Sequence, residues 1–280
     1  MYGRDRPSPR RTMPWLRAAR GSTSHWQRLE RAQRCCTRRD RAEGRFMADL
    51  LRESGADTSL LREVDGPSGH AVIEISAAGQ NRIIVFGGAN RSMTSEYIER
   101  VLDTAQPDDW VLLQNEVNLV PEIIRRAHEK GLRVVFNPSP VPENTEKLPL
   151  ACVSLFMVNE IEAAQLAGTD ANADFEDTLT ALRAKYPNAS VVMTVGADGV
   201  LYDGEEGRFQ LPAFKVKAVD TTAAGDTFCG YFLAAVSAGK SVQTALQEAS
   251  AASALAVSRT GAAPSVPTAD EVREFLRRHA

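Results

Sequence analysis

The segment 219–228, VDTTAAGDTF, combines small residues with a carboxylate and leads into a predicted helix over 226–238. Small side chains leave the backbone N–H groups at the start of that helix open, and the helix dipole favours an anion there. Asp226 lies in the first turn, where it either caps the helix or acts as a general base. An anion hole beside a base is the arrangement that phosphoryl transfer to a hydroxyl requires.

The elements that must position this segment alternate between helix and strand. The predicted strands are 110–114, 133–136, 155–158 and 190–195, and the predicted helices are 45–52, 95–105, 121–130, 160–167, 175–186 and 269–278. Because the strand runs are continuously apolar and rich in β-branched residues, we expect a parallel sheet covered by helices on both faces. A β pair at about 69–86 forms a small appendage to this α/β domain.

Polar clusters follow four of the predicted strands. They are Asn115-Glu116, Asn137-Pro138, Asn159-Glu160-Ile161-Glu162 and the segment 194–199. In a parallel sheet, ligands bind beyond the carboxyl ends of the strands. Each cluster alone is compatible with a helix cap or a turn, but four at one edge of one sheet indicate a ligand crevice.

The composition removes several classes of protein. The chain has 280 residues, of which 43% are hydrophobic and 25% charged, so it can fill a core. It contains no apolar run near the roughly 20 residues that span a bilayer. It has neither a Gly-x-x-x-x-Gly-Lys-Ser/Thr loop nor a Gly-x-Gly-x-x-Gly motif, which excludes a P-loop ATPase and gives no support to a dinucleotide site. Four cysteines without a Cys-x-x-Cys pair lead us to expect a cytoplasmic protein.

The segment DTTAAGDTF, which begins at Asp220, is similar to the second signature of the ribokinase-like (PfkB) carbohydrate kinases. The later segment 252–267, ASALAVSRTGAAPSVP, resembles the same family. The similarity extends back through 194–199, 158–162, 137–140, 114–116 and 88–90, and it covers about 43–280. It implies an ATP-dependent carbohydrate kinase with a three-layer α/β/α fold, a mostly parallel central sheet and a small β lid at 69–86.

The resemblance also implies roles for single residues. Asp226 corresponds to the base that activates the sugar hydroxyl, and Glu116 to a residue that hydrogen-bonds the sugar. The anion hole corresponds to Ala223, Ala224 and Gly225. The ATP site corresponds to Asn159, Thr194, Gly196, Ala197, Gly199, Gly225 and Ser250.

Two kinds of cation are implied by the same resemblance. Asn159 and Glu162 match the family's Asn-x-x-Glu motif, which organises Mg²⁺ and phosphates through water. A K⁺ site corresponds to the Asp220 side chain, the carbonyls of Thr222, Ala256, Arg259 and Gly261, and Ser265. Oxygen ligands suit both cations, because hard cations prefer them.

The resemblance of the tail GAAPSVP at 261–267 to the family's ribose-phosphorylating members implies D-ribose, phosphorylated on its 5-hydroxyl, as the acceptor. The implied partners are therefore ATP and a small sugar, with neither nucleic acid nor membrane involved. The lid at 69–86 corresponds to the segment that often carries a homodimer contact in the family. Adenosine, 2-deoxyribose and fructose stay open as other acceptors.

Residues 1–42 depart from the family pattern. The first 45 residues hold thirteen arginines, no lysine and four acidic residues, whereas the rest of the chain is acidic. The strand with an Asn-x-Asp contact and the Gly-Gly-Lys-Gly-x-Asn loop that open family members have no counterpart. We expect a leader produced by a frameshift or a wrong gene start, with an import signal or a nucleic-acid arm as alternatives. On that hypothesis the chain is a catalytically impaired nucleotide- or sugar-binding remnant.

Overall fold

The computed structural model describes the backbone of residues 36–37, 41–75 and 81–279. Side chains are described for residues 46–71 and 84–279. The interpretation of residues 1–42 as a leader falls almost entirely outside these residues. The structure places two elements at the end of this segment that the sequence did not predict. Strand β1, Cys36–Thr37, pairs in parallel with β2, Glu63–Val64. Helix α3, Arg41–Glu53, begins before the predicted start at residue 45. Gly55, with a φ of 79°, follows α3 as predicted.

The central sheet has six strands in the order β10-β9-β8-β7-β6-β5. Their bounds are β5 Trp110–Gln114, β6 Arg133–Asn137, β7 Leu155–Asn159, β8 Ser190–Thr194, β9 Val200–Gly204 and β10 Gly207–Leu211. Strands β5 to β8 are parallel, and β9 and β10 add an antiparallel edge. The middle strands carry side chains buried on both faces, because helices cover both.

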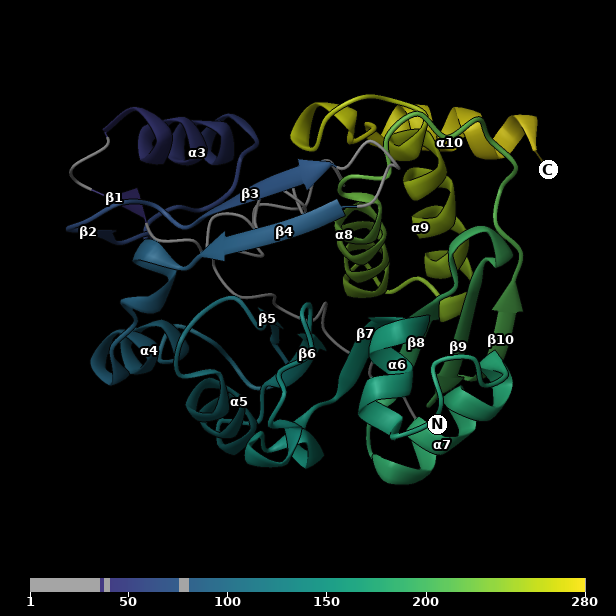
Figure 1. Ribbon diagram of the computed structural model, residues 1–280, viewed down its shortest axis with the longest axis horizontal. Coiled ribbons are helices and arrows are strands. Elements are labelled where there is room, and N and C mark those ends of the chain that lie inside the picture. Colours follow the sequence, from purple (N-terminus) through teal and green to yellow (C-terminus); the bar gives the residue numbers. More distant parts are fainter. Residues whose placement is uncertain (1–35, 38–40, 76–80, 280) are drawn as a thin grey trace, which may run out of the picture.

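Two helical layers enclose this sheet (Figure 1). One layer holds α4 Ser95–Leu102, α5 Val120–Glu129, α6 Glu160–Ala167 and α7 Phe175–Lys185, and the other holds α8 Ala224–Ser237, α9 Val242–Val257 and α10 Ala269–Arg278. The predicted mostly parallel, three-layer α/β/α architecture is confirmed. No helix in the portion of the chain that the structure describes is long and apolar enough to cross a membrane.

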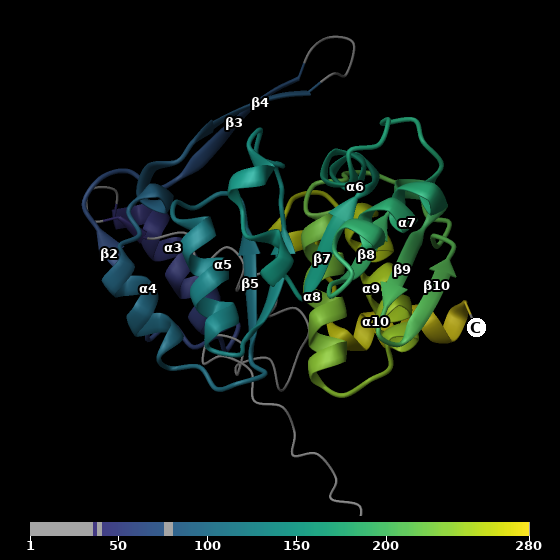
Figure 2. The same ribbon diagram turned by 90° about the horizontal axis from the view of Figure 1, so that it is seen from below.

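The β pair expected at 69–86 is an antiparallel two-stranded sheet of β3, His70–Ile75, and β4, Asn81–Phe86. It projects away from the body of the molecule on the side of α3 and α4 (Figure 2). Three consecutive β4 residues, Ile84, Val85 and Phe86, expose large apolar side chains. Three adjacent exposed apolar side chains on one strand are unusual for a surface that faces only water.

Helices α8 and α9 pack closely along a seam of small residues. The fully buried alanines of α9 are Ala245, Ala249, Ala251, Ala252 and Ala256. The Ser253 hydroxyl of α9 donates to the Ala224 carbonyl in the first turn of α8 at 3.1 Å. Because alanine has the smallest side chain that still favours a helix, α9 forms a close, rigid support behind the start of α8.

Candidate active site

A row of polar side chains lies at the carboxyl ends of the four parallel strands. Gln114 of β5 pairs in register with Asn137 of β6, and Asn159 of β7 pairs with Thr194 of β8. Each is the last residue of its strand, so its side chain lies at the end of the sheet and is not enclosed in the apolar core. The ligand crevice expected at this edge of the sheet is therefore lined by four neighbouring polar groups.

Helix α8 begins two residues earlier than the sequence predicted, at Ala224 rather than Asp226. The preceding residue, Ala223, has a φ of 63°, in the left-handed region that non-glycine residues seldom adopt. This turn leaves the helix without a side-chain cap. Unusual backbone conformations of this kind concentrate at functional sites.

The backbone donors at the start of α8 differ in their availability. The Ala224 N–H donates to the Thr221 carbonyl at 3.2 Å, and the Thr227 N–H donates to the Ala223 carbonyl at 2.9 Å. Within the described part of the chain, the N–H groups of Gly225 and Asp226 have no protein acceptor. These two N–H groups, rather than that of Ala224, are the donors that an anion meets at this helix start.

The Asp226 side chain does not cap its own helix. Its Oδ1 accepts from Gln114 Nε2 at 3.4 Å, across the crevice from β5. The carboxylate is half-buried and lines a cavity of about 190 Å³. The other lining residues are Gln114, Asn137, Ser139, Met157, Val158, Asn159, Glu162, Val192, Thr194, Thr221, Ala223, Ala224, Gly225, Phe228 and Cys229.

A second cavity, of about 410 Å³, lies on the other side of the α8 start and is more apolar. Its walls come from the loop after β10, from the turn after β8 and from α9. They are Thr194, Gly196, Ala197, Gly199, Ala213, Phe214, Val216, Ala218, Thr221, Ala224, Gly225, Phe228, Ser250, Ser253, Ala254 and Val257. An apolar slot with a few polar groups suits a flat heterocyclic ring.

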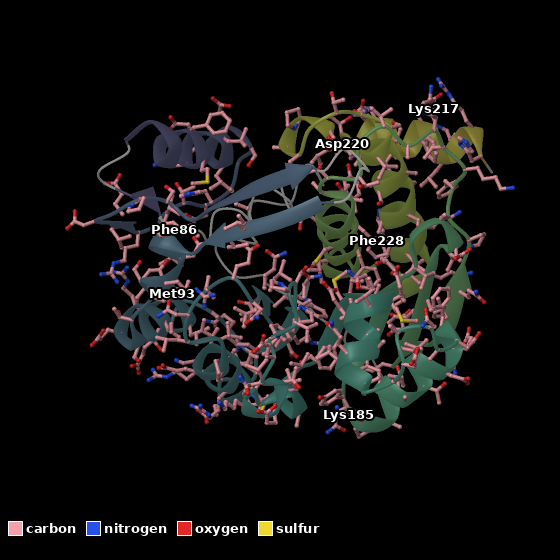
Figure 3. All side chains as sticks on the ribbon, viewed as in Figure 1. Phe86, Met93, Lys185, Lys217, Asp220 and Phe228 are labelled. Atoms are coloured by element: carbon pink, nitrogen blue, oxygen red, sulfur yellow. The ribbon has the colours of Figure 1, made fainter. Side chains whose placement is uncertain are left out.

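Five residues line both cavities, so the cavities meet at the start of α8: Thr194, Thr221, Ala224, Gly225 and Phe228. Figure 3 labels Phe228 within α8 and Asp220 in the loop that enters this helix. The junction places two free N–H groups beside one carboxylate. A group carrying negative charge can therefore pass between the cavities at a point where backbone donors stabilise it.

Asn159 and Glu162 form a reciprocal capping box at the start of α6. The Glu162 N–H donates to Asn159 Oδ1 at 2.8 Å, and the Asn159 N–H donates to Glu162 Oε2 at 3.0 Å. Among the described residues, the second carboxylate oxygen of Glu162, Oε1, has no protein partner. Mg²⁺ keeps several waters when one or two protein oxygens face it, so this donor set fits the cation. No described cluster of three or more His, Cys, Asp or Glu residues forms a metal cage.

The residues expected around K⁺ come from the loop before α8, from the last turn of α9 and from the segment after it. Asp220 Oδ2 accepts from the Gly261 N–H at 2.8 Å, and the Asp220 N–H donates to the Val257 carbonyl. Ser265 is fully buried. The Ala256 carbonyl accepts from the N–H groups of Ser258 and Arg259, which leaves it the least available of the expected ligands. The remaining oxygen donors fit a hard cation.

Hydrogen bonds from the Thr222 side chain and from the backbone N–H groups of Gly261 and Thr222 hold the pKa of Asp220 below its ordinary value of 3.8. A carboxylate with a lowered pKa stabilises the fold above its ordinary pKa, and that contribution disappears as the pH falls through the lowered value. We therefore expect the wild-type chain to have a higher Tm than Asp220→Asn at pH 7, and the difference to shrink toward pH 3. Thermal denaturation across this range measures it, and a difference that grows on acidification would contradict the hydrogen-bond assignment.

Not every expected site residue lines these cavities. Glu116 follows β5 but lies in the wall of neither cavity. Thr222, Arg259 and Gly261 lie in the adjoining loops, and Ala256 lies in the last turn of α9. Gln114 and Ser139 line the first cavity, although the sequence analysis did not name either as a site residue. The signal for Gln114 was its place as the last, polar residue of an otherwise apolar strand.

The pfkB family carbohydrate kinase profile matches residues 40–269. The chain belongs to this family. It is 32% identical over 238 residues to a ribokinase from Haemophilus influenzae, covering 83% of this chain and 77% of that protein. These matches show a carbohydrate kinase of ribokinase type.

Solved structures give the same result for the fold. A ribokinase from Thermotoga maritima has a TM-score of 0.72 and 29% sequence identity, covering 91% of this chain and 86% of that one. An Arabidopsis thaliana ribokinase complexed with ribose and ATP has a TM-score of 0.74 and 27% identity, again covering 91% and 86%. The ribokinase-like fold of this pfkB-family kinase is thereby established.

Proposed function

We propose that this chain transfers the terminal phosphoryl group of ATP to the 5-hydroxyl of D-ribose, giving ribose 5-phosphate and ADP. The observation that carries the proposal is the junction of the two cavities at the first turn of α8. There the Asp226 carboxylate and the free N–H groups of Gly225 and Asp226 share one wall. The similarity to the Arabidopsis protein, whose structure holds ribose and ATP, supports this choice of substrates.

The proposed chemistry balances with Asp226 as the base. The ribose O–H bond breaks as the proton moves to the Asp226 carboxylate, and the hydroxyl oxygen bonds to the terminal phosphorus of ATP. The bond from that phosphorus to the bridging oxygen breaks, and ADP leaves. The segment 223–226 is proposed as the anion hole, in which N–H groups stabilise the charge on the phosphoryl oxygens during transfer.

Each substrate has a proposed place. The adenine ring occupies the apolar second cavity, beside Ser250 and the turn that carries Gly196, Ala197 and Gly199. The phosphates extend toward Thr194, Asn159 and Gly225, where the two cavities meet. Ribose lies on the side of Asp226 and Glu116, under the lid strands β3 and β4.

Asn159 and Glu162 are proposed to hold Mg²⁺ through water; when bound, the cation neutralises charge on the phosphates.

Glu162→Gln keeps an oxygen that can accept the Asn159 N–H, so α6 stays capped while the negative charge is lost. We expect the Mg²⁺ concentration for half-maximal activity to rise roughly tenfold. A Mg²⁺ titration of activity measures this. Asp174→Asn at the start of α7 is the matched control, because it changes a cap of the same chemistry away from both cavities.

A monovalent cation, K⁺, is proposed between the loop before α8 and the end of α9 with the segment after it, where it orders the turn before α8. Its ligands would be the Asp220 side chain, the carbonyls of Thr222, Ala256, Arg259 and Gly261, and Ser265. The cation would act on the anion hole without touching either substrate.

The kinase domain is proposed to occupy about residues 43–280, with 69–86 as its lid. The lid is also proposed as a homodimer contact, which the exposed apolar side chains of Ile84, Val85 and Phe86 support. Pairing of two lids would bury these side chains.

The test is ADP release from the purified chain with ATP, Mg²⁺ and D-ribose, with and without K⁺. The expected result is ribose-dependent, K⁺-stimulated ADP release, with phosphorus NMR placing the phosphate on C5. Parallel reactions with 2-deoxyribose, fructose and adenosine identify the preferred acceptor. ATP binding in calorimetry without turnover on any acceptor would contradict the proposal and indicate a binding remnant.

A further inference from the structure

The amide side chains at the ends of β5 and β6 connect the Asp226 carboxylate to the backbone of β7. Asn137 Nδ2 donates to the Met157 carbonyl at 2.8 Å. Gln114 Nε2 lies 3.3 Å from Asn137 Oδ1 and 3.4 Å from Asp226 Oδ1. Three parallel strands and one helix are thus joined by a single path of hydrogen bonds.

The direction of each bond in this path follows from the Met157 carbonyl. A carbonyl only accepts, so Asn137 must turn its amide nitrogen toward Met157 and its oxygen toward Gln114. Gln114 must then present its nitrogen, which carries two hydrogens. One hydrogen serves Asn137 Oδ1, and the other is directed to Asp226 Oδ1. The backbone of β7 thereby fixes which end of Gln114 faces the carboxylate.

The Asp226 carboxylate has no other protein donor among the described residues. Its Oδ1 is engaged by Gln114, while its Oδ2 has no protein partner within that part of the chain. A hydrogen bond to a charged acceptor is stronger and more directional than one between neutral groups. The bond from Gln114 therefore limits rotation of the carboxylate and distinguishes its two oxygens.

We propose that Gln114 is the positioning residue for Asp226, and that Oδ2 is the oxygen that accepts the proton of the acceptor hydroxyl. This inference rests on the proposed function, in which Asp226 is the base. In this scheme Gln114 acts through Asp226 and not on the reacting atoms. It keeps Oδ1 occupied, so that Oδ2 is the oxygen presented to the hydroxyl, and Asn137 keeps Gln114 in the donating orientation.

The main test is Gln114→Met, which retains the length and approximate volume of the side chain and removes both N–H donors. We expect kcat to fall roughly 10- to 100-fold, the range of one hydrogen bond to a charged group, with the KM for ATP and the Tm unchanged. A double-mutant cycle with Asp226→Asn separates positioning from packing. If Gln114 acts through Asp226, Gln114→Met causes no further loss of kcat in the Asp226→Asn background.

A second measurement does not depend on turnover. The side-chain amide signals of Gln114 in a ¹⁵N-labelled chain are identified by their absence in Gln114→Met. We expect these signals to shift in Asp226→Asn and to stay in place in Asp103→Asn, which changes an exposed carboxylate at the end of α4 that pairs with Lys130 and lines neither cavity.

The outcomes separate this inference from the proposed function. An active wild-type chain whose Gln114→Met variant keeps its kcat, or loses as much kcat again in the Asp226→Asn background, overturns the positioning role. A wild-type chain without sugar-dependent turnover contradicts the proposed kinase instead. In that case, unmoved Gln114 amide signals in Asp226→Asn overturn the inference, and shifted signals support the bond that it requires.

Discussion

Asp226→Asn is expected to reduce sugar-dependent ADP release by about 10²- to 10⁴-fold, the contribution typical of a positioned general base. Asparagine has nearly the same shape, but its amide cannot accept the proton of a hydroxyl. The N–H groups of Gly225 and residue 226 remain, so ATP binding is expected to persist. Steady-state kinetics measure the loss of kcat, and calorimetry measures retained ATP binding.

Asp177→Asn serves as the control for this change, because it removes an exposed carboxylate in the first turn of α7, away from both cavities. We expect it to leave kcat within a few-fold of the wild type. An Asp226→Asn chain with wild-type kcat would exclude Asp226 as the base. Loss of both kcat and the folded state in thermal denaturation would instead assign Asp226 a structural role.

Gly199→Ala is expected to lower the free energy of unfolding by about 3 kcal/mol or more and to weaken nucleotide binding. Gly199 has a φ of 115°, and a Cβ there would lie 2.0 Å from the Leu211 carbonyl oxygen and 2.8 Å from the Ala213 N. Both neighbours are backbone atoms, so the segment after β10 has to move. That segment forms one wall of the second cavity.

The matched control is Gly196→Ala in the same turn. Gly196 also has a positive φ, 55°, but a Cβ there would have no atom within 4 Å. Only the backbone conformation is penalised, at roughly 1 kcal/mol. Chemical denaturation of both variants measures the difference. Equal losses of stability would show that the approach to the Leu211 carbonyl does not decide the effect.

Elements with strong local signals were predicted at their observed bounds. Helix α6, Glu160–Ala167, begins at the Asn159 cap and ends before Gly168, and both signals stand in the sequence. Strand β5, Trp110–Gln114, is a continuous apolar run. The predicted start of helix α8 was two residues late. The helix begins after the left-handed backbone of Ala223, and no capping side chain in the sequence marks that position.

Contacts between segments that are distant in the sequence were the part of the site that sequence patterns could not predict. Gln114 and Asp226 are 112 residues apart, and only the packing of α8 against the sheet brings them together. The sequence also could not show that the Ala224 N–H is used by the Thr221 carbonyl, because this bond depends on the local turn. Asp226 and Thr194 were expected in one cavity and share it, whereas Glu116 lies outside both.

The buried alanines of α9 that support α8 restrict which amino-acid substitutions the protein can accept during evolution. Ala249 and Ala252 are fully buried, so a larger side chain at either position would have to displace its neighbours. On the proposed function, the helix that carries the base is therefore supported by a face that tolerates little change. The loop 213–218 borders only the second cavity and lies outside this seam, although its first residue approaches Gly199 closely. If the nucleotide occupies that cavity as proposed, its preference can change in this loop during evolution while the proposed reaction centre stays fixed.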